Sequence, residues 1–248
     1  MAKSPFYTKD FFTDRQTSTL LTATLMVPIV LELVRPMSVV DVGCGTGEWL
    51  AIFQRHGVGE ILGIDGVYLD KSLLVIPHEH FRALDISMPF TLERTYDLAL
   101  CLEVVEHVAP EQAPDLIETL TQLAPVILFS AAIPFQGGTH HVNEQWPEYW
   151  AQLFRARGYV AVDALRKKIW SNRQIEVWYR QNILVFCTEQ VLASNTTLER
   201  EFRATNPGML SLVHPEMYLL NHWAANHYLK ALIALRHIKY MTRKMLLK

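Results

Sequence analysis

The chain has 248 residues, half of them hydrophobic, and a formal net charge of −2 at pH 7. Its length suits one α/β domain with a large core, and a charge this close to zero gives no electrostatic reason to expect a nucleic-acid partner. Three cysteines cannot all pair, which argues against a disulfide framework and favours a reduced, cytoplasmic protein.

The amino-terminal part predicts a helix and no membrane span. Residues 1–10 lack a basic region followed by an apolar one, so no signal peptide is expected. The most apolar stretch, 20–34, is too short and too polar to cross a bilayer. We predict a helix with one apolar face over about residues 17–34, which Pro28 kinks or breaks and Pro36 ends.

The stretch 39–56 predicts a strand, a glycine turn and a helix, in that order. A short β-branched strand over residues 39–42 carries Asp41, and an amphipathic helix follows from Glu48 to His56. Between them, glycine occupies alternate positions: Gly43, Gly45 and Gly47. In a parallel α/β sheet the turn after the first strand is where ligands bind, and glycine there permits positive φ and close approach of a ligand.

Three further apolar runs predict neighbouring strands with acidic residues at their ends. These runs are residues 61–65, 81–86 and 96–103. The first ends at Asp65, at the spacing from the glycine turn at which an acid accepts hydrogen bonds from both hydroxyls of a ribose. The second contains Asp85, which suits an exocyclic amino group such as that of adenine, and the third ends at Glu103.

Together, these residues resemble the class I S-adenosylmethionine (SAM)-dependent methyltransferases, over residues 39–187. An aspartate before Gly-x-Gly-x-Gly is the first motif of that family. The pattern of dinucleotide dehydrogenases, Gly-x-Gly-x-x-Gly, is not met, because Glu48 stands where its third glycine would fall. An inactive relative that keeps the fold is the alternative.

The resemblance implies a doubly wound, Rossmann-like α/β fold. Its seven-stranded sheet would have the order 3-2-1-4-5-7-6, with the last strand antiparallel and with helices added at both ends of the chain. SAM would lie across the first three strands, with the glycines under its methionine part, Asp65 at the ribose and Asp85 at the adenine. The residues implied to bind SAM are Asp41, Gly43, Gly45, Gly47, Asp65, Gly66, Asp85, Ile86, Leu102 and Glu103.

The family also implies that the amino-terminal helix partly covers the site. The residues placed on its substrate side would be Tyr7, Phe11, Phe12 and Gln16, although a plain covering helix with core aromatics is the alternative. Just beyond the ribose-binding acid, Val67 or Tyr68 is implied to pack on adenine.

A possible cation site follows the fourth predicted strand. On a helix, Glu103, Glu106 and His107 would share one face, because they are three and four residues apart. Two carboxylates and an imidazole are able to hold a divalent cation such as Mg²⁺. The same Glu-x-x-Glu-His run is similar to that of the ubiquinone-biosynthesis O-methyltransferases, in which it binds a magnesium-type ion. In methyltransferases without a metal, these residues only cap or brace the helix.

A polar stretch, 137–146, follows the fifth predicted strand at 126–133 and precedes a helix that begins at Pro147. It lies at the edge of the sheet where the methyl acceptor is expected. Imidazole has a pKa suited to taking a proton from a hydroxyl. We therefore expect His140 or His141 to be the general base and Glu144 to orient it or to contact the substrate. A structural hydrogen bond is the alternative role for a single loop histidine.

The remaining pattern predicts strands at 159–165 and 182–187, and then a change of composition. A polar linker with a short helix is expected over 194–207, followed by a long helix from 214 to about 245. We divide the chain into a methyltransferase domain, 1–190, and a carboxyl-terminal helical extension, 191–248. The apolar face of this extension predicts a homo-oligomer, or packing on the domain; binding to a membrane surface is the alternative.

These features predict a SAM-dependent O-methyltransferase that acts on a hydroxyl of a sugar or glycan. The Asn-Pro-Pro-Tyr or Asp-Pro-Pro-Tyr signature of many N-methyltransferases is absent, because Cys-Leu-Glu-Val stands at 101–104. The run His-His-Val-Asn-Glu-Gln-Trp resembles bacterial enzymes that tailor glycans or natural products. Two alternatives remain: a methyltransferase of small phenolic or polyketide acceptors, and a non-catalytic SAM-binding assembly protein.

Overall fold

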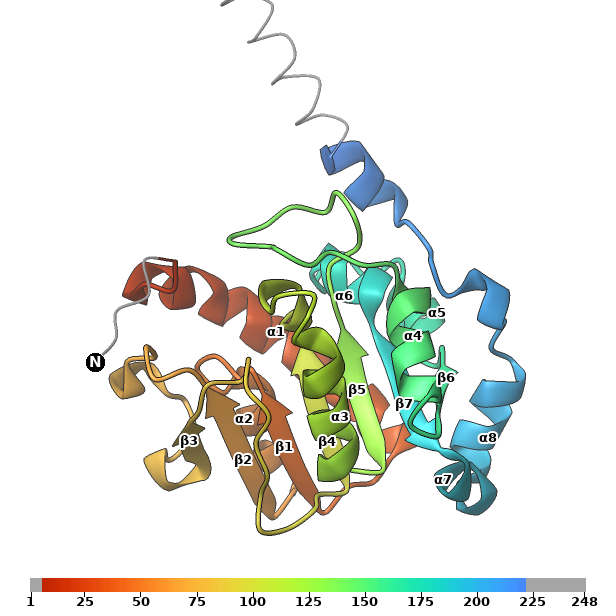
Figure 1. The fold of residues 1–248 in the computed structure, drawn as a ribbon, viewed down its shortest axis with the longest axis horizontal. Coiled ribbons are helices and arrows are strands. Elements are labelled where there is room, and N and C mark those ends of the chain that lie inside the picture. The colour runs from red at the N-terminus through yellow and green to blue at the C-terminus, as the bar shows by residue number, and fades with distance from the viewer. Residues whose placement is uncertain (1–5, 222–248) are drawn as a thin grey trace, which may run out of the picture. The chain divides into compact units, whose positions relative to one another are not determined.

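A computed structural model describes residues 6–221. Its strands are β1 (Ser38–Val42), β2 (Glu60–Asp65), β3 (Phe81–Ala83), β4 (Leu98–Leu102), β5 (Val126–Ser130), β6 (Tyr159–Val162) and β7 (Leu184–Thr188). They form one sheet in the order β3-β2-β1-β4-β5-β7-β6 (Figure 1). Strand β7 runs antiparallel to both of its neighbours, and the other pairs are parallel. The predicted fold class and strand order are therefore confirmed.

Helices cover both faces of this sheet (Figure 1). They are α1 (Lys9–Leu33), α2 (Glu48–Arg55), α3 (Ala113–Leu123), α4 (Pro147–Arg155), α5 (Arg166–Ile169), α6 (Val177–Asn182), α7 (Glu189–Ser194) and α8 (Thr196–Arg203). Short 3₁₀ turns lie at Lys71–Leu73, His78–His80, Val105–His107 and Pro207–Met209.

The core has two halves, one on each face of the sheet. Alternate residues of β4 face opposite ways: Leu100 packs with α1 and α2, whereas Cys101 packs with α3 and α4. Both faces of the strand are buried, which explains why its sequence is continuously apolar instead of alternating. Helices therefore pack on both faces of the sheet, and this packing fixes the carboxyl ends of its strands, where a site is expected.

Helix α1 is longer than the sequence pattern indicated. It begins at Lys9, where the Thr8 hydroxyl caps it by accepting a hydrogen bond from the Phe11 amide, and it continues through Pro28. By length and composition alone it is able to cross a membrane. However, its buried face, which includes Met26 and Val30, packs in the core with α2, as in a core helix.

The compact unit that contains the sheet extends to Leu212, beyond the predicted boundary at residue 190. The short helix predicted within residues 194–207 is α8, but the segment is not a separate linker, because Leu198 of α8 is fully buried in the core of this unit. A second unit begins at Val213, and a helix runs in it from 215 to 221. The rest of the predicted carboxyl-terminal helix lies outside the described residues.

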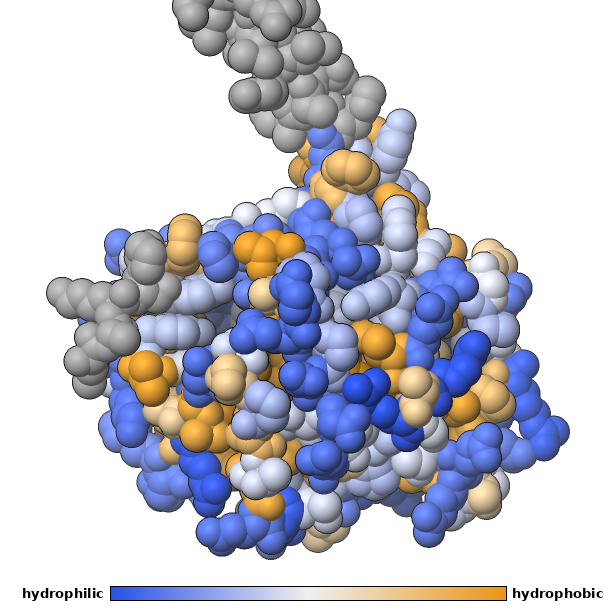
Figure 2. Space-filling model, viewed as in Figure 1, coloured by the Kyte–Doolittle hydropathy of each residue, from blue (hydrophilic) through white to orange (hydrophobic). Residues whose placement is uncertain are grey.

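The view in Figure 2 shows a largely hydrophilic surface that small groups of apolar residues interrupt. Three of the exposed large apolar side chains belong to the segment between β5 and α4: Phe135, Val142 and Trp146. This segment, residues 131–146, is called the acceptor loop below. Phe135 is 88% exposed and has φ of 68°, so its position is fixed by the loop's backbone and not by burial.

Candidate active site

The glycine turn after β1 has the conformation that the sequence predicted. Gly43, Gly45 and Gly47 all have positive φ, at 81°, 53° and 93°. A Cβ on Gly43 would lie 2.4 Å from a methyl carbon of Val104, and one on Gly47 would lie 2.9 Å from the side chain of Ile76. Packing therefore requires the first and third glycines, and both Gly43 and Gly45 border a cavity.

Asp65, at the end of β2, joins that strand to the glycine turn. Its Oδ2 accepts a hydrogen bond from the Gly45 amide (2.7 Å), and its Oδ1 accepts from the Gly66 amide (2.6 Å) and the Tyr68 hydroxyl (2.9 Å). Burial raises the pKa of the carboxyl, and these hydrogen bonds oppose the rise. Asp65 lines the cavity, as a ribose-binding acid must.

Two more buried carboxyl groups lie beside this turn. Asp41 of β1 is 2% exposed, and its burial, together with the nearby Asp65 and Glu48 carboxylates, raises its pKa to about 8. Glu48, the first residue of α2, accepts a hydrogen bond from the Thr46 hydroxyl, and its pKa is also raised by burial. Both groups line the cavity, so this end of it suits a cationic ligand.

Sequence reasoning placed only the start of a helix at Glu48 and missed its carboxylate as part of the site. Its position in the first turn of an amphipathic helix explains why, because acidic residues are common there on electrostatic grounds alone. The cavity-facing direction of its side chain becomes visible only in the folded chain.

Asp85 and Ile86 follow β3 and differ in their surroundings. The Asp85 carboxylate is exposed, and its Oδ1 accepts hydrogen bonds from the amide (3.0 Å) and hydroxyl (2.6 Å) of Ser87. Ile86 lines the cavity, as does Leu102 at the end of β4. The role of Asp85 at the adenine stays a prediction.

Glu103 does not share a helical face with Glu106 and His107. It has φ of 55°, and only one 3₁₀ turn, Val105–His107, follows it in place of the expected helix. Its carboxylate turns to Asn182 and Gln136, whose side-chain amides donate hydrogen bonds at 3.1 Å each. Burial raises the pKa of Glu103, and these two amides oppose the rise.

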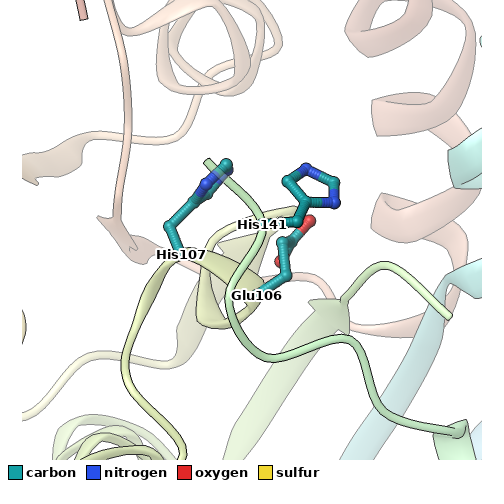
Figure 3. A group of neighbouring side chains, drawn as sticks. All are labelled: Glu106, His107 and His141. Carbon is teal, nitrogen blue, oxygen red and sulfur yellow. The ribbon is translucent and has the colours of Figure 1, made fainter. Parts of the chain in front are cut away.

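A different trio comes together at this edge: Glu106, His107 and His141 (Figure 3). One candidate ligand atom from each lies within 4.8 Å of the others. Glu106 and His107 project from the same turn, and His141 comes from the acceptor loop beside it. Of the three metal ligands predicted from the sequence, the structure brings Glu106 and His107 together and leaves Glu103 apart.

Glu106 is the most unusual member of this cluster. It is fully buried, and neither carboxylate oxygen has a hydrogen-bond partner among the described residues. Burial and the nearby charges of Glu103 and Glu144 raise its pKa well above the ordinary range. A buried carboxyl group without partners is costly unless something else compensates it, and a bound cation is one such compensation.

Both imidazoles of the cluster are oriented through Nδ1. The Nδ1 of His141 lies 3.0 Å from Oε1 of Glu144, and the Nδ1 of His107 lies 3.2 Å from the carbonyl oxygen of His140. Partners of this kind fix the ring and its tautomer, leaving Nε2 to bind a metal or a proton. Burial lowers the pKa of His107 to about 4, so that its imidazole is neutral at physiological pH.

One carboxylate and two oriented imidazoles form a donor set that suits a divalent cation. The orphaned oxygens of Glu106 are consistent with that use. The residues present therefore fit a cation, with Glu106, His107 and His141 as its ligands.

His140 has other surroundings. It is exposed, its φ is 58°, and its ring packs on that of Phe6 with a centroid distance of 4.2 Å. Of the two histidines that the sequence offered as the base, His141 lines the cavity. Glu144 holds it and also accepts hydrogen bonds from the amides of Phe135 (2.8 Å) and Gly137 (2.7 Å).

The cavity has a volume of about 300 Å³ and connects the glycine turn with the histidine cluster. The amino-terminal segment and α1 supply one part of its lining, namely Tyr7, Phe11, Phe12, Arg15, Gln16 and Thr19. The aromatic residues Trp178 and Tyr179 of α6 also line it. The same cavity therefore has the carboxyl groups beside the glycine turn at one end and the histidine cluster at the other.

A family model described as a methyltransferase domain matches residues 15–181. No curated protein sequence matches the chain. Among solved structures, the chain is similar to the plantazolicin methyltransferase BpumL in complex with SAH, with 16% identity over 72% of this chain and 88% of that chain and a TM-score of 0.50. At this identity the likeness shows the fold.

Two further structures carry different descriptions. An O-methyltransferase family protein from Burkholderia thailandensis is 15% identical over 72% of this chain and 59% of that chain, with a TM-score of 0.49. The small RNA methyltransferase HEN1 is 16% identical over 76% of this chain and 27% of that chain, also with a TM-score of 0.49. The chain spans about 60% of the length of the O-methyltransferase-type structures that it matches.

Proposed function

The chain belongs to the methyltransferase-domain family whose model matches residues 15–181, and on that premise we propose that this SAM-dependent methyltransferase transfers the methyl group to a hydroxyl of a sugar or glycan acceptor. The observation that carries the proposal is the cluster of Glu106, His107 and His141 in the same cavity as the glycine turn. Imidazoles held in a fixed orientation beside the glycine turn are suited to an acceptor that must lose a proton.

The donor end of the cavity supports SAM as the methyl source. The carboxyl groups of Asp41 and Glu48 lie at this end, and the cationic ammonium and sulfonium groups of SAM would favour their ionised forms. The glycine turn would pass under the methionine part, and Asp65 would accept hydrogen bonds from the ribose hydroxyls. Ile86 would pack on the adenine, with Asp85 near its amino group.

When bound, SAM supplies a methyl carbon that its sulfonium activates. In the first form of the proposal, His141 takes the acceptor's hydroxyl proton through Nε2 while the acceptor oxygen forms its bond to the methyl carbon and the carbon–sulfur bond breaks. Glu144 holds the imidazole through Nδ1 and stabilises its protonated form. The walls of the cavity align donor and acceptor.

The second form of the proposal adds a divalent cation such as Mg²⁺. Glu106, His107 and His141 would hold it, and a bound cation lowers the pKa of a hydroxyl that contacts it. His141 is then a ligand and not the base. The two forms differ in their response to a chelator.

A sugar acceptor is favoured by the polar groups of the acceptor loop and by the Trp178 and Tyr179 rings in the cavity lining. Aromatic faces commonly pack on sugar rings. A second candidate acceptor, a small phenolic or polyketide compound, is favoured by the apolar rings of Tyr7, Phe11 and Phe12 on the other part of the lining.

We further propose a cytoplasmic enzyme with a small-molecule or oligosaccharide acceptor and no nucleic-acid partner. Cys44, Cys101 and Cys187 are all free and buried, which accords with a reducing compartment. A homo-oligomer formed through the carboxyl-terminal helix stays a prediction, because most of that helix lies outside residues 6–221.

The test is SAM turnover against a panel of sugars and phenols, with and without EDTA and added magnesium. Sugar-dependent turnover that EDTA abolishes and magnesium restores would support the cation form. Turnover that EDTA does not change would support the form in which His141 acts as the base without a cation. If a phenol or an amine is methylated and no saccharide is, the sugar acceptor is wrong.

A further inference from the structure

Acidic side chains outnumber basic ones in the cavity lining. Five carboxyl groups line it, those of Asp41, Glu48, Asp65, Glu103 and Glu106. Burial raises the pKa of each of them, which favours the neutral form. Among the described residues of the lining, Arg15 is the one lysine or arginine, so its guanidinium is a fixed positive charge that is able to attract an anionic ligand.

Arg15 borders the aromatic part of the cavity lining. Its guanidinium carbon is 3.9 Å from the centre of the Phe11 ring, which meets the edge of Tyr7 at a centroid distance of 5.2 Å. Tyr7 in turn packs edge-on against His107, at 5.8 Å, and stacks on Tyr68, at 4.9 Å.

The next residue of α1, Gln16, contacts the glycine turn. The Nε2 of Gln16 donates hydrogen bonds to the Thr46 hydroxyl and to the Leu73 carbonyl oxygen, both at 3.3 Å. Thr46 belongs to the glycine turn, where the methionine part of SAM is proposed to lie. Neighbouring residues of α1 thus contact different parts of the cavity lining, Gln16 the glycine turn and Arg15 the Phe11 ring.

The guanidinium of Arg15 has N–H groups that are able to bind a ligand. Within residues 6–221 it forms no ion pair, and one of its N–H groups donates to the Phe11 carbonyl oxygen at 3.1 Å. The guanidinium is exposed to solvent where it lines the cavity, and it packs on the face of the Phe11 ring. A guanidinium presents paired N–H groups that match the oxygens of a phosphate or a carboxylate.

We infer that Arg15 binds an anionic group, a phosphate or a carboxylate, that the acceptor carries in addition to the hydroxyl that is methylated. The inference rests on the proposed function and narrows its substrate class to sugar phosphates, nucleotide-linked sugars or uronic acids. The carboxylate of SAM is the other anion that reaches the cavity. It is Gln16 that contacts the glycine turn, whereas Arg15 is linked to His107 through the rings of Phe11 and Tyr7, and this arrangement favours the acceptor as the source.

The experiment follows the Nε–H resonance of Arg15 by NMR in the full chain, assigned through Arg15→Lys. SAH and decarboxylated SAH are added first, to separate samples. Glucose 1-phosphate, glucuronate and glucose are then titrated into the SAH-saturated protein. We expect the two anionic sugars to move the resonance and glucose to leave it in place. Arg15→Gln should weaken binding of glucose 1-phosphate by about tenfold or more, with SAH affinity unchanged.

Arg55→Gln is the matched control, because Arg55 is an exposed arginine in the last turn of α2, away from the cavity lining. If SAH moves the Arg15 resonance and decarboxylated SAH does not, Arg15 binds the cofactor and the inference is overturned. It is also overturned if neither anionic sugar moves the resonance, or if glucose moves it equally. Anion binding at Arg15 without methylation of any hydroxyl would instead refute the proposed function and leave the anion site standing.

Discussion

Glu144 and His141 are joined by a hydrogen bond of 3.0 Å between Oε1 and Nδ1, and the same carboxylate accepts from two amides of the acceptor loop. One side chain therefore both folds the loop and orients the imidazole. Beside it, with a ring centroid 4.9 Å from that of His141, His107 receives similar support from the backbone carbonyl of His140. The loop thus sets both rings of the cluster at once.

This relationship predicts different losses at the two adjacent histidines. His141→Ala should lower kcat by about 10²- to 10⁴-fold with the acceptor found in the panel, because it removes the base or a ligand. His140→Ala should lower it much less, because that ring is exposed against Phe6 and its carbonyl oxygen is retained. The measurement is the initial rate of SAH release, with SAH affinity as the control for folding.

Equal losses at the two positions would contradict the assignment of the cavity-facing role to His141. Loss of turnover in His141→Ala with SAH affinity retained would also exclude the non-catalytic alternative, in which the protein only binds SAM. Glu144→Gln should lower kcat more than it lowers SAH affinity.

The donor end gives a second prediction, at Asp65. Asp65→Ala should weaken SAH binding by roughly tenfold to a hundredfold, because the ribose hydroxyls lose a charged acceptor. The substitution also removes the acceptor of the Gly45 and Gly66 amides, so the melting temperature must be measured alongside. Isothermal titration with SAH checks the affinity, and a folded variant of unchanged affinity would show that the ribose is bound elsewhere.

The fold could be predicted from the sequence because β1, β2 and β4 are short apolar runs at whose ends a glycine or an acid stands: Gly43, Asp65 and Glu103. The continuous apolarity of β4, buried on both faces, and the position of Asp65 at the end of β2 are local features that a sequence displays directly. The strand order was predicted from the resemblance to the methyltransferases, because no single apolar segment of a sequence indicates which strands are neighbours in the sheet.

The cluster was harder to predict, because its geometry depends on contacts distant in sequence. Helical spacing placed Glu103 with Glu106 and His107, but Glu103 takes a left-handed φ, with its amide bonded to the Ser130 carbonyl oxygen at 2.9 Å. His141 reaches the cluster because the Val142 amide donates to the Glu106 carbonyl oxygen at 2.8 Å. Neither contact leaves a local pattern in the sequence.

The buried carboxyl of Asp41 gives a prediction about pH. Its pKa is raised from an ordinary value of 3.8 to about 8, so between these pH values the unfolded chain binds fewer protons than the folded one. The free energy of unfolding must therefore fall as the pH rises through this window, to the extent that Asp41 contributes. Asp41→Asn has no such group, and its stability should gain on the wild type as the pH rises.

Urea unfolding of both proteins at a series of pH values across this window measures the difference. Because Glu48 and Asp65 are present in both chains, their own titrations largely cancel in the comparison. Two stability curves that stay parallel from pH 4 to pH 8 would show that Asp41 has an ordinary pKa, contrary to its burial.

The orphaned carboxylate of Glu106 predicts a metal dependence that is independent of turnover. If the cluster binds a cation, Mn²⁺ titrated by electron paramagnetic resonance should bind the wild type. Glu106→Gln and His141→Ala should each weaken binding by more than the roughly 10- to 100-fold typical of losing an outer-shell partner. Because the pKa of Glu106 is raised by burial, binding should release a proton and strengthen as the pH rises.

Glu103→Gln separates the two possible ligand sets. In the structure this carboxylate is bonded to Asn182 and Gln136, apart from the trio, so its substitution should change Mn²⁺ affinity less than that of Glu106. If Glu103→Gln lowers Mn²⁺ affinity as much as Glu106→Gln does, Glu103 is a metal ligand, as its spacing in the sequence suggests. No Mn²⁺ binding in the wild type would exclude the cation and leave Glu106 to serve as a buried, protonated carboxyl beside a histidine base.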